Sequence, residues 1–308
     1  MNWFGVMPAI TTPFDENLQV DHAFLTQHAA WLLANGCTGL VLLGSLGEGA
    51  TLESDEKVAI LKTGILAAAG KAPIVAAISA LSTKAAVELA KHAESAGCSG
   101  LMVLPPYVYA SDWREMRAHV SAVIAATSLP CMLYNNPIAY KTDFLPEQIA
   151  ELTQEHPNLA AVKESSADIR RIAAIRSILG DRLKIFVGVD DAIVEGIAAG
   201  ATGWVAGLVN AYPAESVALF NLALESRHEE AFALYRWFLP LLRMDTVLKF
   251  VQLIKWVQEQ ARVGSARVRP PRLELAGPDL AEAQATFAIA LASRPTISER
   301  RFSEFYET

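Results

Sequence analysis

The sequence of 308 residues lacks an excess of positive charge. Its 26 lysines and arginines are outnumbered by 33 aspartates and glutamates, which gives a formal net charge of −7. Proteins that bind nucleic acid or an anionic membrane need a basic face, so we expect neither as a partner. A small anionic substrate stays possible, because the local field at a site decides whether such a molecule binds.

Cysteine and histidine are also scarce. The three cysteines, Cys37, Cys98 and Cys131, lie at or just before apolar runs and show no paired spacing. This pattern is typical of buried, reduced thiols in a cytoplasmic protein. The six histidines are scattered and form no ligand pair with a carboxylate at helical or turn spacing. We therefore expect no metal site.

Segments that direct a chain into a membrane are missing as well. The first five residues have neither the basic nor the apolar region of a signal peptide. The uncharged stretch 22–47 is broken by Gly36 and Gly39, which favours helix, loop and strand over a membrane span. We expect a cytoplasmic location.

The sequence does contain eight short apolar runs that alternate with longer amphipathic segments. Runs that are apolar on both faces predict parallel strands covered by helices on both sides. The runs are 6–10, 39–43, 74–78, 100–104, 131–134, 159–162, 185–187 and 203–206.

Helix boundaries are marked at both ends. Asp21 and Ser54 are suitable N-caps, and Asp55 and Glu56 suit a first helical turn. Glycines stand where five helices should end, at Gly36, Gly70, Gly97, Gly180 and Gly200.

Similar turn-and-strand sequences recur at 36–41, 97–102 and 200–205. Eight such units predict an α/β (β/α)₈ barrel. A doubly wound sheet would carry a nucleotide fingerprint after its first strand, and Thr11-Thr12-Pro13-Phe14 is not one.

The strand pattern stops after about residue 213. Segments 214–226, 229–242, 246–262 and 279–293 predict helices, and 264–278 predicts a loop. We expect residues 1–225 to form the barrel with its active site and residues 226–308 to form a C-terminal helical extension. Four arginines in and before the loop are interpreted as a solvated surface, with a binding patch as the alternative: Arg262, Arg267, Arg269 and Arg272.

Reactive groups of such barrels lie at the carboxyl ends of the strands, where Lys163 follows the sixth run. Burial lowers the pKa of a lysine, and a neutral amine can attack a carbonyl to form an iminium. From position alone, a lysine with its head group in water is the open alternative. Tyr134, at the end of the fifth run, is either a proton shuttle or a core tyrosine.

Three further strand ends carry polar or glycine-rich segments. Segment 44–48, Gly-Ser-Leu-Gly-Glu, either binds a carboxylate through its backbone N–H groups and Ser45 or is an ordinary loop. Asp190 and Asp191 suggest a metal, but we prefer one of them as a helix N-cap. Gly207 and Leu208 leave room for a ligand against the backbone.

In this order the segments resemble the dihydrodipicolinate synthase and N-acetylneuraminate lyase family over nearly the whole chain. The resemblance rests on segments 5–14, 44–48, 104–107, 134–137, 162–165 and 188–191. It implies a class I lyase that acts through a lysine Schiff base, and usually a homotetramer of two tight dimers.

The resemblance also implies individual roles. Lys163 matches the Schiff-base lysine, Tyr134 the proton relay and Ser45 the first hydroxyl of the carboxylate loop. Tyr107 matches the tyrosine lent across a dimer interface to a neighbour's relay. Substrate-binding positions are expected at Gly44, Leu46, Gly47, Ala139, Tyr140, Gly188, Gly207 and Leu208.

Two departures from the family pattern bear on the substrate. Leu46 replaces the usual threonine, which removes a hydroxyl. Ala139 stands where dihydrodipicolinate synthases carry an arginine for the aldehyde's carboxylate, and the loss of that clamp argues against this synthesis.

Segments 1–3, 44–48, 134–137, 234–238 and 244–246 look like the bacterial deaminases of 1-pyrroline-4-hydroxy-2-carboxylate. The last two lie in the C-terminal helices and are interpreted as marks of subgroup ancestry more than of chemistry. The leading hypothesis is this deaminase, which yields 2,5-dioxopentanoate and ammonia and needs no metal or organic cofactor. The alternatives are a 2-keto-3-deoxy sugar acid aldolase or dehydratase, a pyruvate aldolase like dihydrodipicolinate synthase, and a 2-oxo acid sensor without catalysis.

Overall fold

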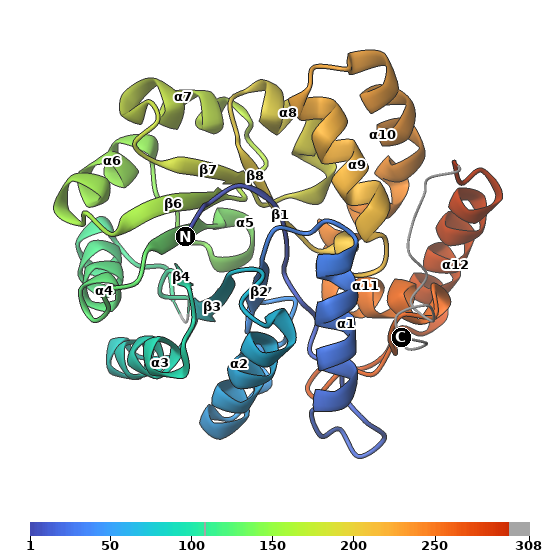
Figure 1. The fold of residues 1–308 in the computed structure, drawn as a ribbon, viewed down its shortest axis with the longest axis horizontal. Helices are drawn as coiled ribbons and strands as arrows, with labels where there is room; N and C mark the ends of the chain where they lie inside the picture. The colour runs from blue at the N-terminus through green and yellow to red at the C-terminus, as the bar shows by residue number, and fades with distance from the viewer. Residues whose placement is uncertain (108, 296–308) are drawn as a thin grey trace.

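Eight parallel strands form the centre of the computed structural model, which describes residues 1–107 and 109–295. Their order around the sheet is β1-β8-β7-β6-β5-β4-β3-β2, and a bridge between Ala9 and Val41 joins β1 to β2. The predicted (β/α)₈ barrel is confirmed (Figure 1). The strands are β1 (Gly5–Pro8), β2 (Leu40–Leu42), β3 (Ile74–Ile78), β4 (Gly100–Val103), β5 (Cys131–Asn135), β6 (Leu159–Glu164), β7 (Lys184–Val187) and β8 (Gly203–Ala206).

Helices surround these strands. They are α1 (His22–Ala34), α2 (Ser54–Ala68), α3 (Thr83–Ala96), α4 (Trp113–Ala125), α6 (Pro146–Glu155), α7 (Arg170–Leu179), α8 (Ile193–Ala198) and α9 (Pro213–Leu224). Short turns after the strands are η1 (Gly49–Thr51), α5 (Pro137–Tyr140), η2 (Asp190–Ala192) and η3 (Leu208–Asn210).

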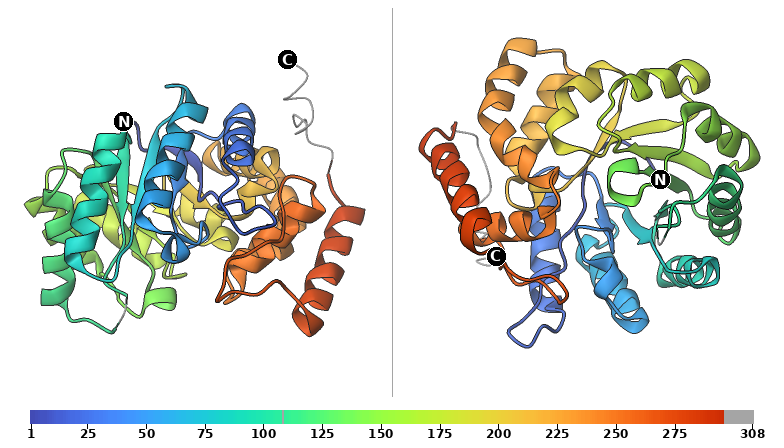
Figure 2. Two further views of the ribbon diagram at one scale, coloured as in Figure 1. Left: turned by 90° about the horizontal axis from the view of Figure 1, so that it is seen from below. Right: turned by 180° about the vertical axis from the view of Figure 1, so that it is seen from behind.

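The remaining helices lie to one side of the barrel, with α12 outermost in Figures 1 and 2. They are α10 (His228–Leu242), α11 (Phe250–Gln260) and α12 (Gly277–Ala292), with the turn η4 (Arg243–Asp245) between α10 and α11. The four helices expected after residue 213 are present. Where the barrel domain ends, at residue 225 or elsewhere, stays a prediction.

Most helix ends agree with their sequence signals. The carboxylate of Asp21 accepts the Phe24 N–H at 2.9 Å, and the five predicted terminal glycines all have positive φ angles. The prediction of Ser54 as an N-cap is wrong. Glu53 is the extended residue before α2, and its N–H donates to the Glu56 carboxylate at 2.8 Å, so Ser54 is already helical.

The core is packed tightly around the strands. The three cysteines are free and buried, as expected. Phe186 on β7 is fully buried, and its ring packs edge-on against Trp3 below the sheet. Gly203 on β8 leaves the space that this ring fills, because an added Cβ would lie 2.2 Å from a ring carbon of Phe186. Among the described helices, none is both long and apolar enough to cross a membrane.

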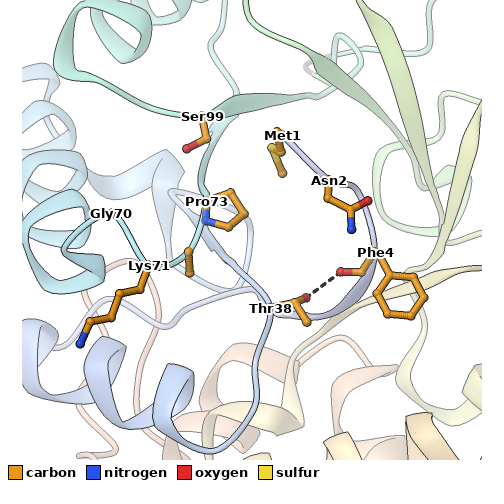
Figure 3. A pocket seen from close by; sticks show the side chains of 9 residues that line it. Met1, Asn2, Phe4, Thr38, Gly70, Lys71, Pro73 and Ser99 are labelled. Carbon is orange, nitrogen blue, oxygen red and sulfur yellow. Dashed lines mark hydrogen bonds between the residues drawn. The ribbon is translucent and has the colours of Figure 1, made fainter.

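A hollow of about 510 Å³ lies at the amino ends of the strands. Figure 3 shows Met1, Asn2, Pro73 and Ser99 around it, with the Lys71 amine pointing away. The Thr38 hydroxyl donates to the Phe4 carbonyl at 2.7 Å and ties two of its walls together. In barrels of this kind the amino-terminal face serves stability, and reactive groups lie at the opposite face.

We predict that Gly203→Ala destabilises the fold by about 1–3 kcal/mol, because the Phe186 ring has no space to move into. Urea unfolding measures this change. Gly44→Ala is the matched control, since its added carbon meets nothing nearer than 3.9 Å. Equal stability of the two variants would contradict the packing argument.

Candidate active site

A cavity of about 980 Å³ opens at the carboxyl ends of the strands. Strand ends and their loops form its floor, and residues of η4, α11 and α12 form one side. Predicted site residues in its lining are Gly44, Ser45, Leu46, Tyr107, Tyr134, Ala139, Tyr140, Lys163, Gly188 and Gly207.

Gly47 and Leu208 do not belong to the described lining of this cavity. The Gly47 carbonyl accepts a hydrogen bond from the Thr12 hydroxyl at 2.6 Å, behind the cavity wall. The side chain of Leu208 is fully buried in the core. Direct substrate contact by these two residues stays a prediction.

Lys163 lies inside β6 and is 6% exposed, which rules out the alternative of a head group in bulk water. Its Nζ lies 4.3 Å from the centre of the Tyr134 ring. Burial lowers its pKa to about 8, although the nearby carboxylates of Asp245 and Asp190 oppose that shift. A useful fraction of the amine is therefore neutral near physiological pH.

Gly188, at the end of β7, makes room for this lysine. An added Cβ there would lie 2.7 Å from Cε of Lys163. The same Cβ would lie 1.8 Å from Oγ of Ser165, so a larger residue would clash with both side chains.

Tyr134 is paired with Lys163 in the register of the neighbouring strands β5 and β6. Its hydroxyl accepts a hydrogen bond from the Asn136 amide at 2.9 Å. Burial raises the pKa of the phenol to about 12, and the Asn136 hydrogen bond offsets part of that shift. The phenol keeps its proton at neutral pH and can give it to a neighbouring atom.

Tyr140 links this pair to the loop after β2. Its hydroxyl forms a hydrogen bond with the Ser45 hydroxyl, and its ring packs edge-on against Tyr134, with 5.8 Å between the ring centres. Tyr107 lies on the other side of Tyr140, with 5.6 Å between the ring centres. Within one chain, Tyr140 therefore contacts both Ser45 and Tyr134, although the sequence predicted only a substrate wall at this position.

Asp190 does not cap a helix, so that interpretation is wrong. The N-cap of α8 is Ala192, which makes no side-chain cap. The buried Asp190 carboxylate instead accepts hydrogen bonds from the Trp204 indole at 2.9 Å, the Gly207 N–H at 3.1 Å and the Leu208 N–H at 2.8 Å. It thereby fixes the end of β8 next to Lys163.

Burial raises the pKa of Asp190 to about 6, against the effect of those three hydrogen bonds. A metal is not indicated at Asp190 and Asp191: within residues 1–107 and 109–295, no three histidine, cysteine or carboxylate side chains gather in a way that could hold one.

A buried ion pair joins the loop after β2 to the C-terminal helices. The Lys255 amine of α11 lies 2.6 Å from Oε1 of Glu48, and both side chains are almost fully buried. Glu48 adopts a left-handed backbone conformation, φ 55°, and its second carboxylate oxygen accepts the Arg269 N–H at 3.0 Å. The segment 44–48 is therefore held in place by residues more than 200 positions later in the chain.

The surface interpretation of the four arginines is wrong for two of them. Arg269 is largely buried and forms a bidentate ion pair with Glu56, at 2.8 and 2.9 Å. Arg272 lines the cavity. Arg262 is exposed, as expected.

Asp245 is the cavity residue whose role the sequence interpretation missed. It belongs to η4, in the segment interpreted as a mark of ancestry, and its Oδ1 is shielded from solvent. A rule that looks only at strand ends cannot find it, because it reaches the cavity from the C-terminal extension. The available signal was the acidic residue itself in segment 244–246.

The model of the Dihydrodipicolinate synthetase family matches residues 2–290 of the chain. The chain belongs to this family. As a member of the dihydrodipicolinate synthetase family, it is a lyase of the class I aldolase type that acts on a small molecule.

Named relatives agree with this assignment. A 4-hydroxy-tetrahydrodipicolinate synthase of Agrobacterium fabrum is 31% identical over 274 residues, which cover 89% of this chain and 93% of the relative. One of an Exiguobacterium species is 36% identical over 223 residues, with 71% and 75% covered.

Solved structures are similar throughout. The 4-hydroxy-tetrahydrodipicolinate synthase of Methylacidiphilum fumariolicum aligns with a TM-score of 0.90 at 26% identity, covering 94% of this chain and 97% of that one. A putative dihydrodipicolinate synthetase of Pseudomonas aeruginosa aligns with a TM-score of 0.88 at 29% identity, covering 94% and 100%.

We predict that Glu48→Gln destabilises the protein by about 3–5 kcal/mol, because it leaves the Lys255 ammonium buried without a counter-charge. The double variant Glu48→Gln/Lys255→Met should lose less than the single variant, since no charge is then stranded. Urea unfolding of both variants tests this. A double variant that is less stable than Glu48→Gln would contradict the argument.

Proposed function

We propose that this family member is a 1-pyrroline-4-hydroxy-2-carboxylate deaminase that works through a Schiff base on Lys163. The observation that carries the proposal is a buried amine of lowered pKa beside Tyr134, in a cavity whose wall at Ala139 offers a methyl group where a guanidinium would be needed for a second carboxylate. The cyclic imine has only one carboxylate to bind.

The chemistry begins when the neutral Lys163 amine adds to C2 of the cyclic imine. The bond from C2 to the ring nitrogen then breaks, which leaves a Schiff base at C2 and a primary amine on C5. The cationic Schiff base withdraws electrons from C3, so a C3 proton can leave to give an enamine. Tyr134, close to Lys163, is the group that moves protons at this stage, with Ser45 as its partner.

The enamine electrons next expel the 4-hydroxyl group, which leaves with one proton as water. Proton shifts convert the C5 amine to an imine, which one water hydrolyses to an aldehyde and ammonia. A second water releases the product ketone from Lys163. Since one water is formed and two are used, the balance is substrate plus one water to 2,5-dioxopentanoate plus ammonia. The lysine itself is the electron sink, so this route uses no metal or organic cofactor.

The substrate carboxylate is assigned to the loop after β2. The N–H groups near Gly44 and Leu46 suit an anion, and Gly44 lets it approach the backbone. The Ser45 hydroxyl, which forms a hydrogen bond with Tyr140, would turn toward the carboxylate on binding. Arg272 adds positive charge to the same cavity.

Condensation of pyruvate with an aldehyde is the second candidate, because the relatives described above are named 4-hydroxy-tetrahydrodipicolinate synthase. It uses the same lysine. Ala139 speaks against an aldehyde that carries its own carboxylate. The homotetramer implied by family resemblance belongs with this proposal, and light scattering of the purified protein measures it.

We predict that reductive trapping of pyruvate on Lys163 speeds up as the pH rises to about 8 and then levels off. A lowered pKa means that the amine loses its proton, and gains nucleophilicity, as the pH passes through 8. Mass spectrometry of the peptide containing Lys163, after cyanoborohydride reduction, measures the rate. A rate that keeps rising to pH 10 would indicate an unperturbed lysine, and Lys163→Arg supplies the background.

We predict that the purified protein releases ammonia from 1-pyrroline-4-hydroxy-2-carboxylate and that Lys163→Ala lowers this release by at least about 10³-fold. The other lysine in the cavity lining, Lys249, is held in an ion pair with Asp279 and does not lie beside Tyr134 as Lys163 does. An ammonia assay coupled to glutamate dehydrogenase measures the release. Absence of ammonia together with condensation of pyruvate and an aldehyde would replace the deaminase with the second candidate.

A further inference from the structure

The carboxyl group of Asp245 lies in the cavity lining and has no role in the proposed deamination steps. It lies in η4, at the end of α10, and lines the same cavity as Lys163 and Tyr134. The carboxyl group rests directly on the backbone of β8, since a carbon added at Gly207 would lie 2.0 Å from Oδ1 and 2.4 Å from Cγ. Oδ1 has no hydrogen-bond partner among the described residues.

The glycines under the two groups lie on neighbouring strands. Lys163 sits over Gly188 at the end of β7, and Asp245 sits over Gly207 at the end of β8. In the register of β7 and β8, Val187 lies opposite Trp204. Val187 is one residue before Gly188, and Trp204 is three residues before Gly207. The lysine and the carboxyl group therefore line the same cavity, and each lies near enough to shift the pKa of the other.

Burial and two neighbouring carboxylates raise the pKa of Asp245 and so favour its protonated form. The groups that act on it are Lys163 of β6 and the carboxylates of Asp190 and Asp191 in η2. Burial raises the pKa of Asp245 well above its usual value, and Asp190 raises it further, while Lys163 acts in the opposite direction. A protonated carboxyl group whose Oδ1 has no partner within residues 1–107 and 109–295 is available to donate its proton to a ligand.

We infer that Asp245 is the acid that protonates the hydroxyl leaving C4 of the Lys163-bound substrate. This rests on the proposed function and deepens it. As the enamine electrons form the C3–C4 double bond, the C4–O bond breaks and the oxygen takes the Asp245 proton, so that water leaves and the aspartate becomes a carboxylate. The proton removed from C3 later returns to the aspartate through solvent, and no oxidant or reductant is needed.

An acid at the C4 oxygen determines whether the Schiff base undergoes dehydration or retro-aldol cleavage. Loss of the 4-hydroxyl needs an acid at that oxygen, whereas cleavage of the C3–C4 bond in a retro-aldol reaction needs a base there to take the hydroxyl proton. A protonated Asp245 favours dehydration. The substrate class is therefore a 2-oxo acid, or its cyclic imine, with a hydroxyl group on C4.

Asp245→Asn tests the inference, because it keeps the shape and removes the acid. We expect ammonia release from 1-pyrroline-4-hydroxy-2-carboxylate to fall by about 10²–10⁴-fold, while trapping of pyruvate on Lys163 stays within about threefold of wild type. The trapped substrate adduct should retain its hydroxyl group, one water heavier than the dehydrated adduct. Asp55→Asn, which removes an exposed carboxylate outside the cavity lining, is the control and should keep wild-type ammonia release.

A structural role would give a different result. It would lower pyruvate trapping and ammonia release together and leave the mass of the trapped adduct unchanged. The wild-type rate should also fall at high pH as Asp245 loses its proton, and the variant should lack this limb. Full ammonia release by Asp245→Asn, or a variant adduct that has already lost water, would overturn the inference.

Failure of the proposed function is recognised separately. If wild type releases no ammonia from the pyrroline, the same trapping is done with an open-chain 4-hydroxy-2-oxo acid. Dehydrated adduct in wild type and intact adduct in Asp245→Asn would still support the acid role. Intact adduct, or products of C3–C4 cleavage, in wild type would overturn it.

Discussion

Removal of the Lys163 amine from bulk water is the constraint on which the arrangement of this molecule depends. An ammonium ion at the end of a buried strand is costly, and the protein meets that cost in part by favouring the neutral amine. The amine lies over the Tyr134 ring, between strand ends, and only a small part of Lys163 is exposed. The eight strands supply the apolar floor, and the C-terminal helices supply the cover that a barrel alone lacks.

Ion pairs hold the C-terminal extension against the barrel. Lys255 reaches from α11 to Glu48 in the loop after β2, and Arg269 reaches Glu56 at the start of α2. A buried ion pair contributes little net stability compared with an apolar pair of the same volume, but its geometry is specific. The pair therefore fixes where the extension sits, and with it the position of Asp245 against Gly207.

The barrel and the centre of its site could be predicted because they follow local rules. Apolar runs, terminal glycines and the position of Lys163 at a strand end are all visible within a few residues. Asp190, Arg269 and Asp245 were misjudged because their partners are distant in sequence. From the sequence alone Asp190 is expected to cap a helix, because only the fold brings the N–H groups of Gly207 and Leu208 to its carboxylate. From the sequence alone Asp245 is a residue at the end of a helix, because only the packing of the C-terminal extension on the barrel brings it into the cavity lining.

The glycines that follow β7 and β8, Gly188 and Gly207, limit how the substrate specificity of the enzyme can be changed. Other side chains already occupy the space next to each glycine, so neither position leaves room for a new ligand, although both line the cavity. A side chain introduced at either glycine would clash with Ser165 and Lys163 or with Asp245. The wall around Ala139 and Ile138, which is partly exposed and carries no reactive group, is where new shapes can be introduced without disturbing the amine.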